Sequence, residues 1–382
     1  MRVLHIANWY PTKDSYSANF IRNHYRCAKT ISDSTLVHVE VRYGAPKFQT
    51  NLHLDNEEKY ILLYAPLPPS RVVEALTLLL LLFALLSFRL RGKTFDLYLF
   101  HIAYPLLAQV RLLKRILNKP MAILEHWTAY QKGFNLPEGS PGRRRIGEIF
   151  HHQIPLLTVS EALRDDIVEF CGTDSFDQYL VPNVISEDIF YPRDRGERKA
   201  VVFLTVANWS SPNKRLMLVV EAFHRLCQAG EDLQLRIAGE GEQLLDARAF
   251  LANHPETLER VTFLGNFLDP TGLAEEMANA DALLHPTAFE TFSLVCAESL
   301  FCETPVLASN VEPIPTFVGE MNGMLIENNV DSWEVGLREF LGCRERYRTG
   351  HLGDDVRSRF NGEAVAGIMK QTFETILERW KA

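Results

Sequence analysis

The chain has 382 residues, which is enough for about two domains with substantial hydrophobic cores. Hydrophobic residues make up 47% and charged residues 23%, as in ordinary soluble globular proteins. The formal net charge is −8. Residues 1–195 hold 23 basic and 20 acidic side chains, and the rest of the chain holds 17 basic and 28 acidic ones. This distribution excludes general nucleic-acid binding, and only the first half is suited to an anionic surface.

Strands and helices alternate along the whole chain. Strand candidates are VLHIA, LVHVEV, DLYLFH, AILEH and LLTVS in the first half, and VVFLTVA, LQLRIAGEG, VTFLG, ADALLHP, PVLAS and GMLIE in the second. Helical patterns fill most of the gaps, which is typical of an α/β protein with parallel sheets and covering helices. A Pro- and charge-rich stretch after Pro182-Asn183 predicts the boundary between domains at 1–184 and 185–362.

The amino terminus and the cysteines indicate the compartment. The segment MRVLHIANWYP has too short an apolar run for a signal peptide and is predicted to form the first strand. Six scattered cysteines, without Cys-x-x-Cys or Cys/His zinc spacing, are typical of reduced core cysteines. We therefore expect a cytoplasmic protein.

An unusually apolar stretch runs from Ala75 to Phe88. It holds 14 uncharged residues, and a spanning helix needs about 20, so we expect it not to cross a bilayer. A plain core position is the favoured interpretation, because helices apolar on every side are usually buried. The alternative is peripheral docking at the inner face of an anionic membrane, since basic residues flank the stretch and 111–119 is a basic amphipathic segment. The triple 143–145 (Arg-Arg-Arg) is expected in a solvated loop, with a phosphate or lipid-headgroup site as its alternative.

A polar turn follows the strand Val201 to Ala207, and the next helix is predicted to begin near Arg215. Lys214 therefore lies where a strand loop meets a helix amino terminus, a position that suits an anion such as phosphate. A solvated surface lysine is the alternative.

Two glutamates separated by seven residues lie in FETFSLVCAESLFCETPVLASN. ADALLHP predicts a buried strand and Ser293 to Cys302 an apolar helix, so Glu290 lies at the carboxyl end of a strand, where open α/β sheets bind ligands. Helix spacing places Glu298 on a stripe that should be buried, and a buried carboxylate needs a hydrogen-bonding partner. A hydroxyl-rich ligand such as ribose or a hexose would provide one; internal backbone donors are the alternative.

This block resembles the donor-sugar signature of the retaining glycosyltransferases of the large sucrose-synthase-like family (family four). That signature is Glu-Gly-Phe-Gly, then Leu, a second Glu and a Pro-Val strand. The residues that match or replace it here are Glu290, Thr291, Phe292, Ser293, Leu294, Glu298 and Pro305-Val306. The resemblance extends over essentially the whole chain. It implies the GT-B fold, in which two Rossmann-like domains face each other across an interdomain cleft and the last helix, 363–382, packs back on the first domain.

The resemblance also implies a function. A retaining, metal-independent glycosyltransferase without other cofactors would move a sugar from a nucleoside diphosphate sugar to a saccharide or polyprenyl-linked acceptor, in polysaccharide or envelope glycan synthesis. Its donor-binding residues would be Asn208, Lys214, Thr291, Phe292, Ser293, Leu294 and Glu298. Lys214, Asn208 and the amides of the 290–294 loop would hold the diphosphate, while Glu298 would hold the ribose and Glu290 the donor sugar. The loops at 238–241 and 264–266 would border the nucleobase.

His126 resembles the histidine of the family's first domain that faces the reacting sugar, so His126 and Glu290 are the catalytic candidates. His126 closes the strand AILEH, and a neutral imidazole can donate to a hydroxyl without adding charge. His101 ends another strand and is a comparable structural candidate. Four aromatic side chains at strand ends suit sugar stacking or interdomain packing: Trp9, Tyr10, Trp127 and Tyr130.

Three departures from the family pattern bear on activity. Thr291 and Ser293 replace glycines, which narrows the allowed backbone angles. Asn208 stands where an arginine is usual, and Ser17-Ala18-Asn19 stands where a Gly-Gly turn is usual. A non-catalytic nucleotide-sugar-binding or scaffolding subunit is therefore the alternative function. A hydrolysing nucleotide-sugar epimerase would need further acid/base carboxylates.

Overall fold

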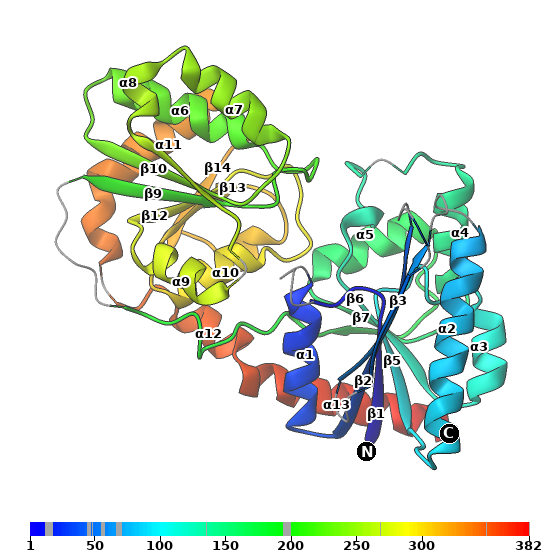
Figure 1. Ribbon diagram of the computed structural model, residues 1–382. Coiled ribbons are helices and arrows are strands. Elements are labelled where there is room, and N and C mark those ends of the chain that lie inside the picture. Colours follow the sequence, from blue (N-terminus) through cyan, green and yellow to red (C-terminus); the bar gives the residue numbers. More distant parts are fainter. Residues whose placement is uncertain are drawn as a thin grey trace. The chain divides into compact units, whose positions relative to one another are not determined.

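Two largely parallel sheets organise the chain, one in each of two units (Figure 1). The first unit comprises Met1–Val184 and Glu363–Ala382, and the second comprises Ile185–Gly362. The computed structural model describes residues 1–11, 18–43, 47, 49–54, 58–65, 71–134, 136–193, 200–267, 269–348 and 350–381. The predicted α/β class and the alternation of strands and helices are confirmed.

The sheet of the first unit has eight strands in the order β3-β4-β2-β1-β5-β6-β7-β8. Its strands are β1 (Arg2–Ala7), β2 (Asp33–Tyr43), β3 (Gln49–Leu54), β4 (Glu58–Ala65), β5 (Leu97–His101), β6 (Met121–Glu125), β7 (Leu156–Thr158) and β8 (Gln178–Leu180). All of them pair in parallel except β3, which is antiparallel to β4. The sequence did not predict β3 and β4, whereas β8 is the expected strand that runs into Pro182. The edge strand β3 (QTNLHL) lacks the continuous apolar run of a central strand, since it has a neighbour on one side only, whereas β4 contains the apolar run 60–65 between β3 and β2.

Helices cover both faces of this sheet (Figure 1). They are α1 (Asn19–Lys29), α2 (Arg71–Leu90), α3 (Val110–Leu117), η1 (Thr128–Tyr130), α4 (Pro141–Phe150), α5 (Glu161–Cys171) and α13 (Gly362–Lys381). Val365, Met369 and Phe373 of α13 pack in one core cluster with Val3 of β1 and Leu99 of β5. The last helix therefore does pack on the first unit, as predicted.

The second unit has six parallel strands in the order β11-β10-β9-β12-β13-β14. The strands are β9 (Val201–Val206), β10 (Leu233–Ala238), β11 (Val261–Gly265), β12 (Ala282–His285), β13 (Val306–Ser309) and β14 (Gly323–Ile326). All six were predicted. The helices are α6 (Leu216–Gln228), α7 (Gln243–Ala252), α8 (Pro255–Leu258), α9 (Pro270–Ala278), α10 (Leu294–Phe301), η2 (Ile314–Thr316), α11 (Val330–Cys343), η3 (Arg344–Tyr347) and α12 (Asp354–Phe360).

Strand order reverses in the middle of this second sheet. From β9 the chain moves outward to β10 and β11, and it then returns to β12 on the other side of β9. The loops that follow β9 and β12 therefore start side by side at the carboxyl ends of neighbouring strands and lead away in opposite directions. In open α/β sheets, ligands bind at such a reversal.

Two sequence expectations for the first unit are wrong. The apolar stretch 75–88 is not plain core, because Leu79 and Phe83 are exposed on the outer side of α2. The arginine triple is not in a loop, because it forms the first turns of α4 behind the cap Ser140. Arg145 forms an ion pair with Glu74 of α2, and Arg143 lies 4.2 Å from the centre of the Phe170 ring.

Candidate functional site

The loops that follow β9 and β12 lie against each other at the strand reversal of the second sheet. Lys214 pairs with Thr287 in an isolated antiparallel bridge. The Arg215 amide donates to the Pro286 carbonyl at 3.2 Å, and the Ala288 amide donates to the Asn213 carbonyl at 2.7 Å. These backbone contacts bring side chains 76 positions apart in sequence to one place.

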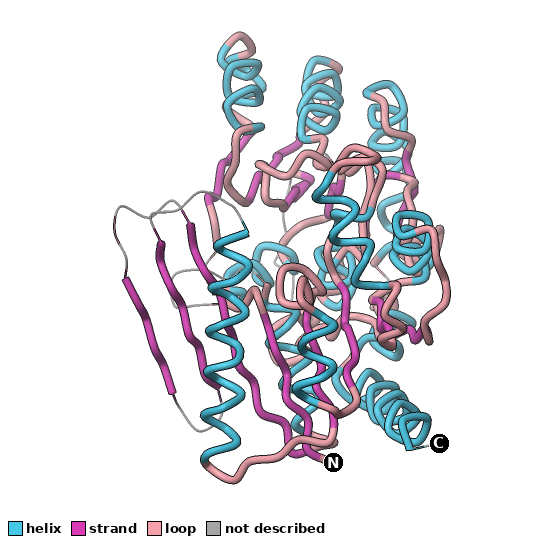
Figure 2. Tube along the Cα trace, turned by 90° about the vertical axis from the view of Figure 1, so that its right-hand side faces the viewer, coloured by secondary structure: helices cyan, strands magenta, loops and turns pink. Residues whose placement is uncertain are grey.

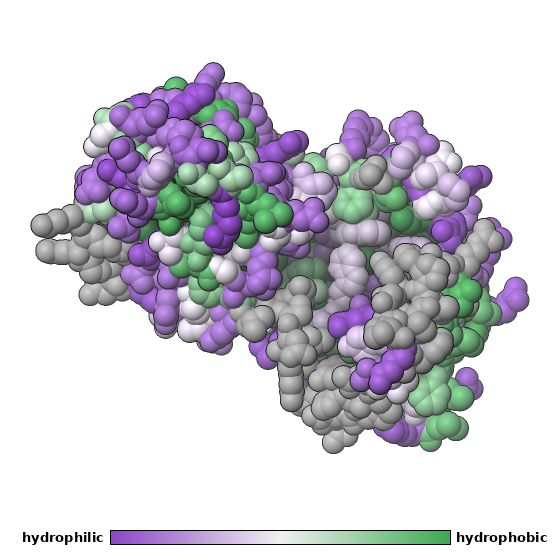
Figure 3. Space-filling model, turned by 45° about the horizontal axis from the view of Figure 1, so that its top comes forward, coloured by the Kyte–Doolittle hydropathy of each residue, from purple (hydrophilic) through white to green (hydrophobic). Residues whose placement is uncertain are grey.

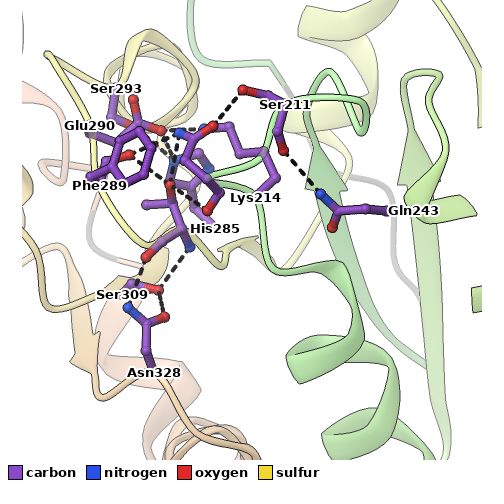
Figure 4. Close-up of polar contacts among 11 residues, drawn as sticks. Ser211, Lys214, Gln243, His285, Phe289, Glu290, Ser293, Ser309 and Asn328 are labelled. Carbon is purple, nitrogen blue, oxygen red and sulfur yellow. Dashed lines mark hydrogen bonds and ion pairs between the residues drawn. The ribbon is translucent and has the colours of Figure 1, made fainter. Parts of the chain in front are cut away.

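Lys214 and Glu290 form an ion pair at this place (Figure 4). His285, the last residue of β12, shares the same carboxylate oxygen, with Nε2 2.9 Å from Glu290 Oε1. The Ser293 hydroxyl lies 3.1 Å from the same His285 nitrogen. The alternative of a solvated Lys214 is wrong, because its side chain is only 13% exposed and is paired.

The electrostatics keep Glu290 ionised. Burial alone would raise its pKa, but the charge of Lys214 and the hydrogen bond from His285 outweigh burial and bring the pKa to about 2. Burial and the Lys214 charge lower the pKa of His285, so the imidazole is neutral at pH 7. Because an ionised carboxylate can only accept, Nε2 of His285 must carry the proton. Glu290 is thus an acceptor and cannot be a general acid near neutrality.

A second layer of hydrogen bonds holds the 287–290 loop. The Asn213 side-chain amide donates to the Phe289 carbonyl at 2.9 Å. The Thr287 amide donates to the Ser309 hydroxyl at 2.9 Å, and the Asn328 amide donates to the Thr287 carbonyl at 2.9 Å. Support therefore comes from the loop after β9 and from the ends of β13 and β14 (Figure 4). Such support is what a preorganised polar site requires.

Two residues that replace glycines of the family pattern keep a glycine-like backbone. Ser293, the amino-terminal cap of α10, has φ 73° and ψ 71°, and Ala18, the cap of α1, has φ 61° and ψ 26°. Side chains disfavour this left-handed region by about 1–2 kcal/mol. Thr291 is not among the residues with positive φ, so only the second glycine of the 290–293 block has a conformational equivalent here. Ser17 lies outside the described residues.

The pKa of Glu298 is shifted in the opposite direction from that of Glu290. Glu298 is half-buried on α10, and burial raises its pKa to about 7. Within the described part of the chain its carboxylate has no hydrogen bond or ion pair, and burial is the one cause of its pKa shift, so the alternative of internal donors finds no support. Around it, Phe292 is buried against Phe317 and Phe360, while Thr291 and Leu294 are half-buried.

Asn208 is exposed on the loop after β9, and its side-chain oxygen accepts from the Ser210 amide at 3.1 Å. The glycine loop after β10 lies directly against this loop. A Cβ on Gly239 would fall 1.9 Å from the Ala207 oxygen, and one on Gly241 would fall 2.1 Å from the Ser210 nitrogen. Glycine is required at both positions because no side chain fits between the two loops.

His126 belongs to the first unit and lies just beyond the end of β6. It is buried, and no described residue lies within hydrogen-bond distance of either ring nitrogen, although the Asn183 side chain is near enough to favour the protonated ring slightly. Its ring packs 4.5 Å from the Phe20 ring and 5.2 Å from that of His24. Burial and His24 lower the pKa of His126 well below its ordinary value, so it is neutral. Its rival His101 hydrogen-bonds His5 at 2.9 Å.

Glu125 positions His126 and was not predicted from the sequence. Its wholly buried carboxylate accepts from the amides of His126, Trp127 and Ala103 at 2.9, 3.0 and 2.9 Å. It also accepts from the Tyr130 hydroxyl at 2.7 Å. The sequence did contain a signal for Glu125, because it is the one charged residue of the otherwise apolar strand MAILE and ends that strand. The same signal, a histidine closing ADALLH, could have found His285.

The four aromatic candidates separate into two kinds. Tyr10 and Tyr130 are buried, so the expectation that they offer free faces to a sugar is wrong. Trp9 and Trp127 are half-buried and pack edge to face with ring centres 5.8 Å apart. Only the two tryptophans keep accessible ring surface.

Three comparisons with known proteins bear on this geometry. Residues 200–342 match the family model described as glycosyl transferases group 1. A GDP-mannose-dependent alpha-(1-6)-phosphatidylinositol dimannoside mannosyltransferase of Mycobacterium tuberculosis is 28% identical over 193 residues, or 47% of this chain and 48% of that protein. A D-inositol 3-phosphate glycosyltransferase of Segniliparus rotundus is 25% identical over 301 residues, 73% of this chain and 66% of that protein. The match thus spans about half the length of the first relative.

Solved structures extend the similarity to both units. A sucrose-phosphate synthase from Thermosynechococcus elongatus superposes with a TM-score of 0.75 at 18% identity, covering 99% of this chain and 100% of that one. Anabaena HepE in complex with UDP gives 0.72 at 14% identity, covering 98% and 100%. The chain has the GT-B fold, and residues 200–342 of its second unit are similar to the group 1 glycosyl transferases. The group 1 segment contains Asn208, Lys214, Glu290 and Glu298, whereas His126 lies outside it.

No group of three or more His, Cys, Asp or Glu side chains within the described ranges is placed to hold a metal ion. The six cysteines are thiols rather than disulfides. The cation at the strand reversal of the group 1 domain is Lys214.

Proposed function

We propose that this protein is a retaining glycosyltransferase that moves a sugar from a nucleoside diphosphate sugar to a saccharide or lipid-linked saccharide. The observation that carries the proposal is the Lys214–Glu290 pair at the strand reversal of a group 1 domain. It places one cation and one permanent hydrogen-bond acceptor where such sheets bind ligands.

The roles follow from the charges. Lys214 would exchange its contact with Glu290 for the donor diphosphate and would stabilise the charge that develops on the leaving group. Glu290, with its pKa near 2, would accept hydrogen bonds from the donor sugar throughout the reaction. Glu298, which has no internal partner among the described residues, would accept from the ribose hydroxyls. His126 would donate to the sugar from the first unit as a neutral imidazole.

In this reaction the bond from the anomeric carbon to the diphosphate breaks, and the bond to the acceptor oxygen forms on the same face. The acceptor proton passes to the departing phosphate, so no side chain has to serve as the base. This fits the low pKa of Glu290, because a carboxylate that stays ionised near pH 2 is a weak base. We also propose that no metal is required, since Lys214 supplies the cation; unchanged turnover in excess EDTA is the expected result.

The relatives support the substrate classes. One uses GDP-mannose and a phosphatidylinositol dimannoside, as its name states, and a structural neighbour binds UDP-glucose. We therefore propose a nucleoside diphosphate sugar as the donor and a lipid-linked or soluble saccharide in envelope glycan synthesis as the acceptor.

The test is nucleoside diphosphate release from a panel of UDP-, GDP- and ADP-sugars, with the wild type and Glu290→Gln measured in parallel. Slow hydrolysis of one donor, lost by about a hundredfold or more in Glu290→Gln, is the expected result. Glu334→Gln is the matched control, because that half-buried carboxylate on α11 is likewise paired with a cation, here the surface residues Arg225 and Arg338. Full activity in Glu290→Gln would remove the residue from the reaction.

One observation favours a second function, a non-catalytic nucleotide-sugar-binding subunit. Asn208 brings no charge to the position of the usual arginine, and its side-chain oxygen is engaged by Ser210. Binding of a nucleotide sugar, detected by thermal shift, without turnover on any donor or acceptor would support this second function over the first.

A further inference from the structure

The outer side of α2 is an apolar stripe. From residue 72 to residue 86 the exposed positions of α2 recur every three or four residues, which is the spacing of one helix face. They are Val72, Ala75, Leu79, Phe83 and Leu86, and Leu90 ends the same stripe. Leu79 is 60% exposed, Phe83 58% and Leu90 79%. Figure 3 shows a hydrophobic band at the right-hand edge of the molecule, where Figure 1 places α2.

The opposite side of α2 packs on the sheet. Val73 joins a core cluster with Val41 of β2, and Phe88 packs edge to face with Phe95 at 5.4 Å. By length and composition Val72–Leu90 could cross a membrane, but one face is bound to protein along its length and 28% of the window is buried. A helix with one protein face and one apolar face suits the surface of a bilayer rather than its interior.

Helix α3 continues the stripe and adds charge. Figures 1 and 2 show α3 beside α2 on the same side of the sheet. Leu112 and Ile116 of α3 are exposed, next to Arg111, Lys114 and Arg115. Long basic side chains beside exposed apolar ones are the composition of helices that lie in the headgroup region.

The charge of this region is opposite to that of the chain. Residues 71–119 contain eight Lys or Arg and two acidic residues, whereas the whole chain has a net charge of −8. Both acids are also engaged, since Glu74 accepts from Arg145 and Tyr104, and Asp96 pairs with Arg2. The segment therefore presents an excess of positive charge, which an anionic surface would attract.

A groove of about 1200 Å³ lies between α2, α3 and α4. Its lining includes Ala75 and Leu78 from the apolar helix and Arg111, Arg144 and Arg145 from the other two. The Arg144 side chain is exposed and makes no hydrogen bond or ion pair within the described ranges. Guanidinium groups beside an apolar wall match a lipid phosphate with its acyl chains.

We propose that the α2–α3 surface, formed by the apolar stripe of α2 with Leu112, Ile116 and the basic residues of α3, docks on an anionic lipid bilayer. The stripe enters the boundary between headgroups and acyl chains, and the groove takes a lipid phosphate. The proposal rests on the first unit alone, so it holds or fails independently of the proposed sugar transfer.

The test is sedimentation of the full chain with phosphatidylcholine vesicles, with or without about one third phosphatidylglycerol. We expect binding to the anionic vesicles at low salt and little binding to the neutral ones. The double change Leu79→Glu with Phe83→Glu should reduce binding at least tenfold, because a charge at this depth is costly. Both side chains are exposed, so folding should be kept. The control Leu245→Glu alters a leucine that is 69% exposed on α7 of the second unit and should bind like the wild type.

Two further variants sharpen the result. Arg111→Glu with Arg115→Glu should abolish the preference for anionic vesicles, and the tryptophan of Phe83→Trp should shift its emission to the blue on binding. Donor hydrolysis in solution should be unchanged in all of these variants. Wild-type protein that stays wholly in the supernatant at low salt would overturn the proposal. So would a lipid-free dimer that Phe83→Glu dissociates, since the stripe would then bind a second copy.

Discussion

The two candidate clusters of this protein satisfy their polar groups in opposite ways. In the second unit Glu290 is fully engaged, by the Lys214 cation and the His285 N–H. In the first unit His126 is buried, and neither of its nitrogens has a partner within hydrogen-bond distance among the described residues, although Glu125 holds the surrounding backbone through three amide hydrogen bonds and accepts a fourth from the Tyr130 hydroxyl. Lys214 can exchange its ion pair with Glu290 for an ion pair with a charged ligand. The neutral His126 imidazole, in contrast, can form a new hydrogen bond with an uncharged donor or acceptor of a ligand. Under the proposed function, the second unit would recognise the charge of the donor and the first unit would add a neutral contact.

The largest effect is expected from Lys214→Ala, which breaks the paired cluster. Turnover should fall by about a hundredfold or more, because the leaving diphosphate loses its cation. The variant should also unfold more easily, by about 3–5 kcal/mol, since Glu290 is left buried and ionised without its partner. Donor hydrolysis and urea unfolding measure the two losses. Lys132→Ala is the control, because that lysine forms an exposed pair with Glu169. Equal turnover in both variants would show that Lys214 does not contact the donor.

A smaller effect on rate, with the opposite effect on stability, is expected from His126→Leu. Turnover should fall by about ten- to a hundredfold, as when one positioned polar contact to the sugar is lost. Stability should be equal or higher by about 1 kcal/mol, because an unpaired buried polar group is replaced by an apolar one. A large loss of stability would instead mean that His126 has a structural partner in solution.

The pH dependence should separate the two units. The pKa values of His5 and His24 are lowered to about 3 and 4, first by burial, so the unfolded chain takes up protons below pH 6.5 while the folded unit does not. The free energy of unfolding of the first unit is therefore highest above pH 6.5, and it falls as the pH drops from 6.5 towards the folded-state pKa values of about 3 and 4. In the second unit Glu290, with a pKa lowered to about 2, loses its contribution only below pH 4.5, and His285 is one buried histidine of lowered pKa there against four in the first unit. Amide hydrogen exchange between pH 7 and 5, corrected for intrinsic rates, should show β1, β5 and β6 losing protection before β9 and β12. The reverse order would contradict the assignment.

The smallest effect concerns the left-handed cap of α10. Ser293→Gly removes the strain of φ 73° but also the hydroxyl contact with His285, whereas Ser293→Ala keeps the strain and loses the contact. The glycine variant should therefore be more stable than the alanine variant by about 1 kcal/mol, in thermal or urea unfolding. Equal stabilities would mean that the backbone relaxes without cost.

The sequence alone determined most of the second unit. Its central strands β9, β12 and β13 are nearly continuous buried runs because neighbours cover both of their faces, and α10 begins after Ser293 as the apolar pattern predicts. The 290–298 block also contained the residues that lie near the strand reversal. The sequence marked His285 as a histidine that closes an apolar strand, but it could not show the contact with Glu290, because such a histidine has the same sequence pattern whether or not it touches a carboxylate.

Tertiary structure decided what each apolar or charged side chain faces. The run 75–88 is equally apolar around the helix, so periodicity could not tell that Leu81 would be buried on the sheet and Leu79 exposed. Lys214 and Glu290 are far apart in the chain, and only the order β9-β12 brings their loops together. Local sequence determines which residues form strands and helices, because it sets the apolar period. Which side chains come into contact across the sheet depends on the order of the strands, and that order arises only when the whole sheet assembles.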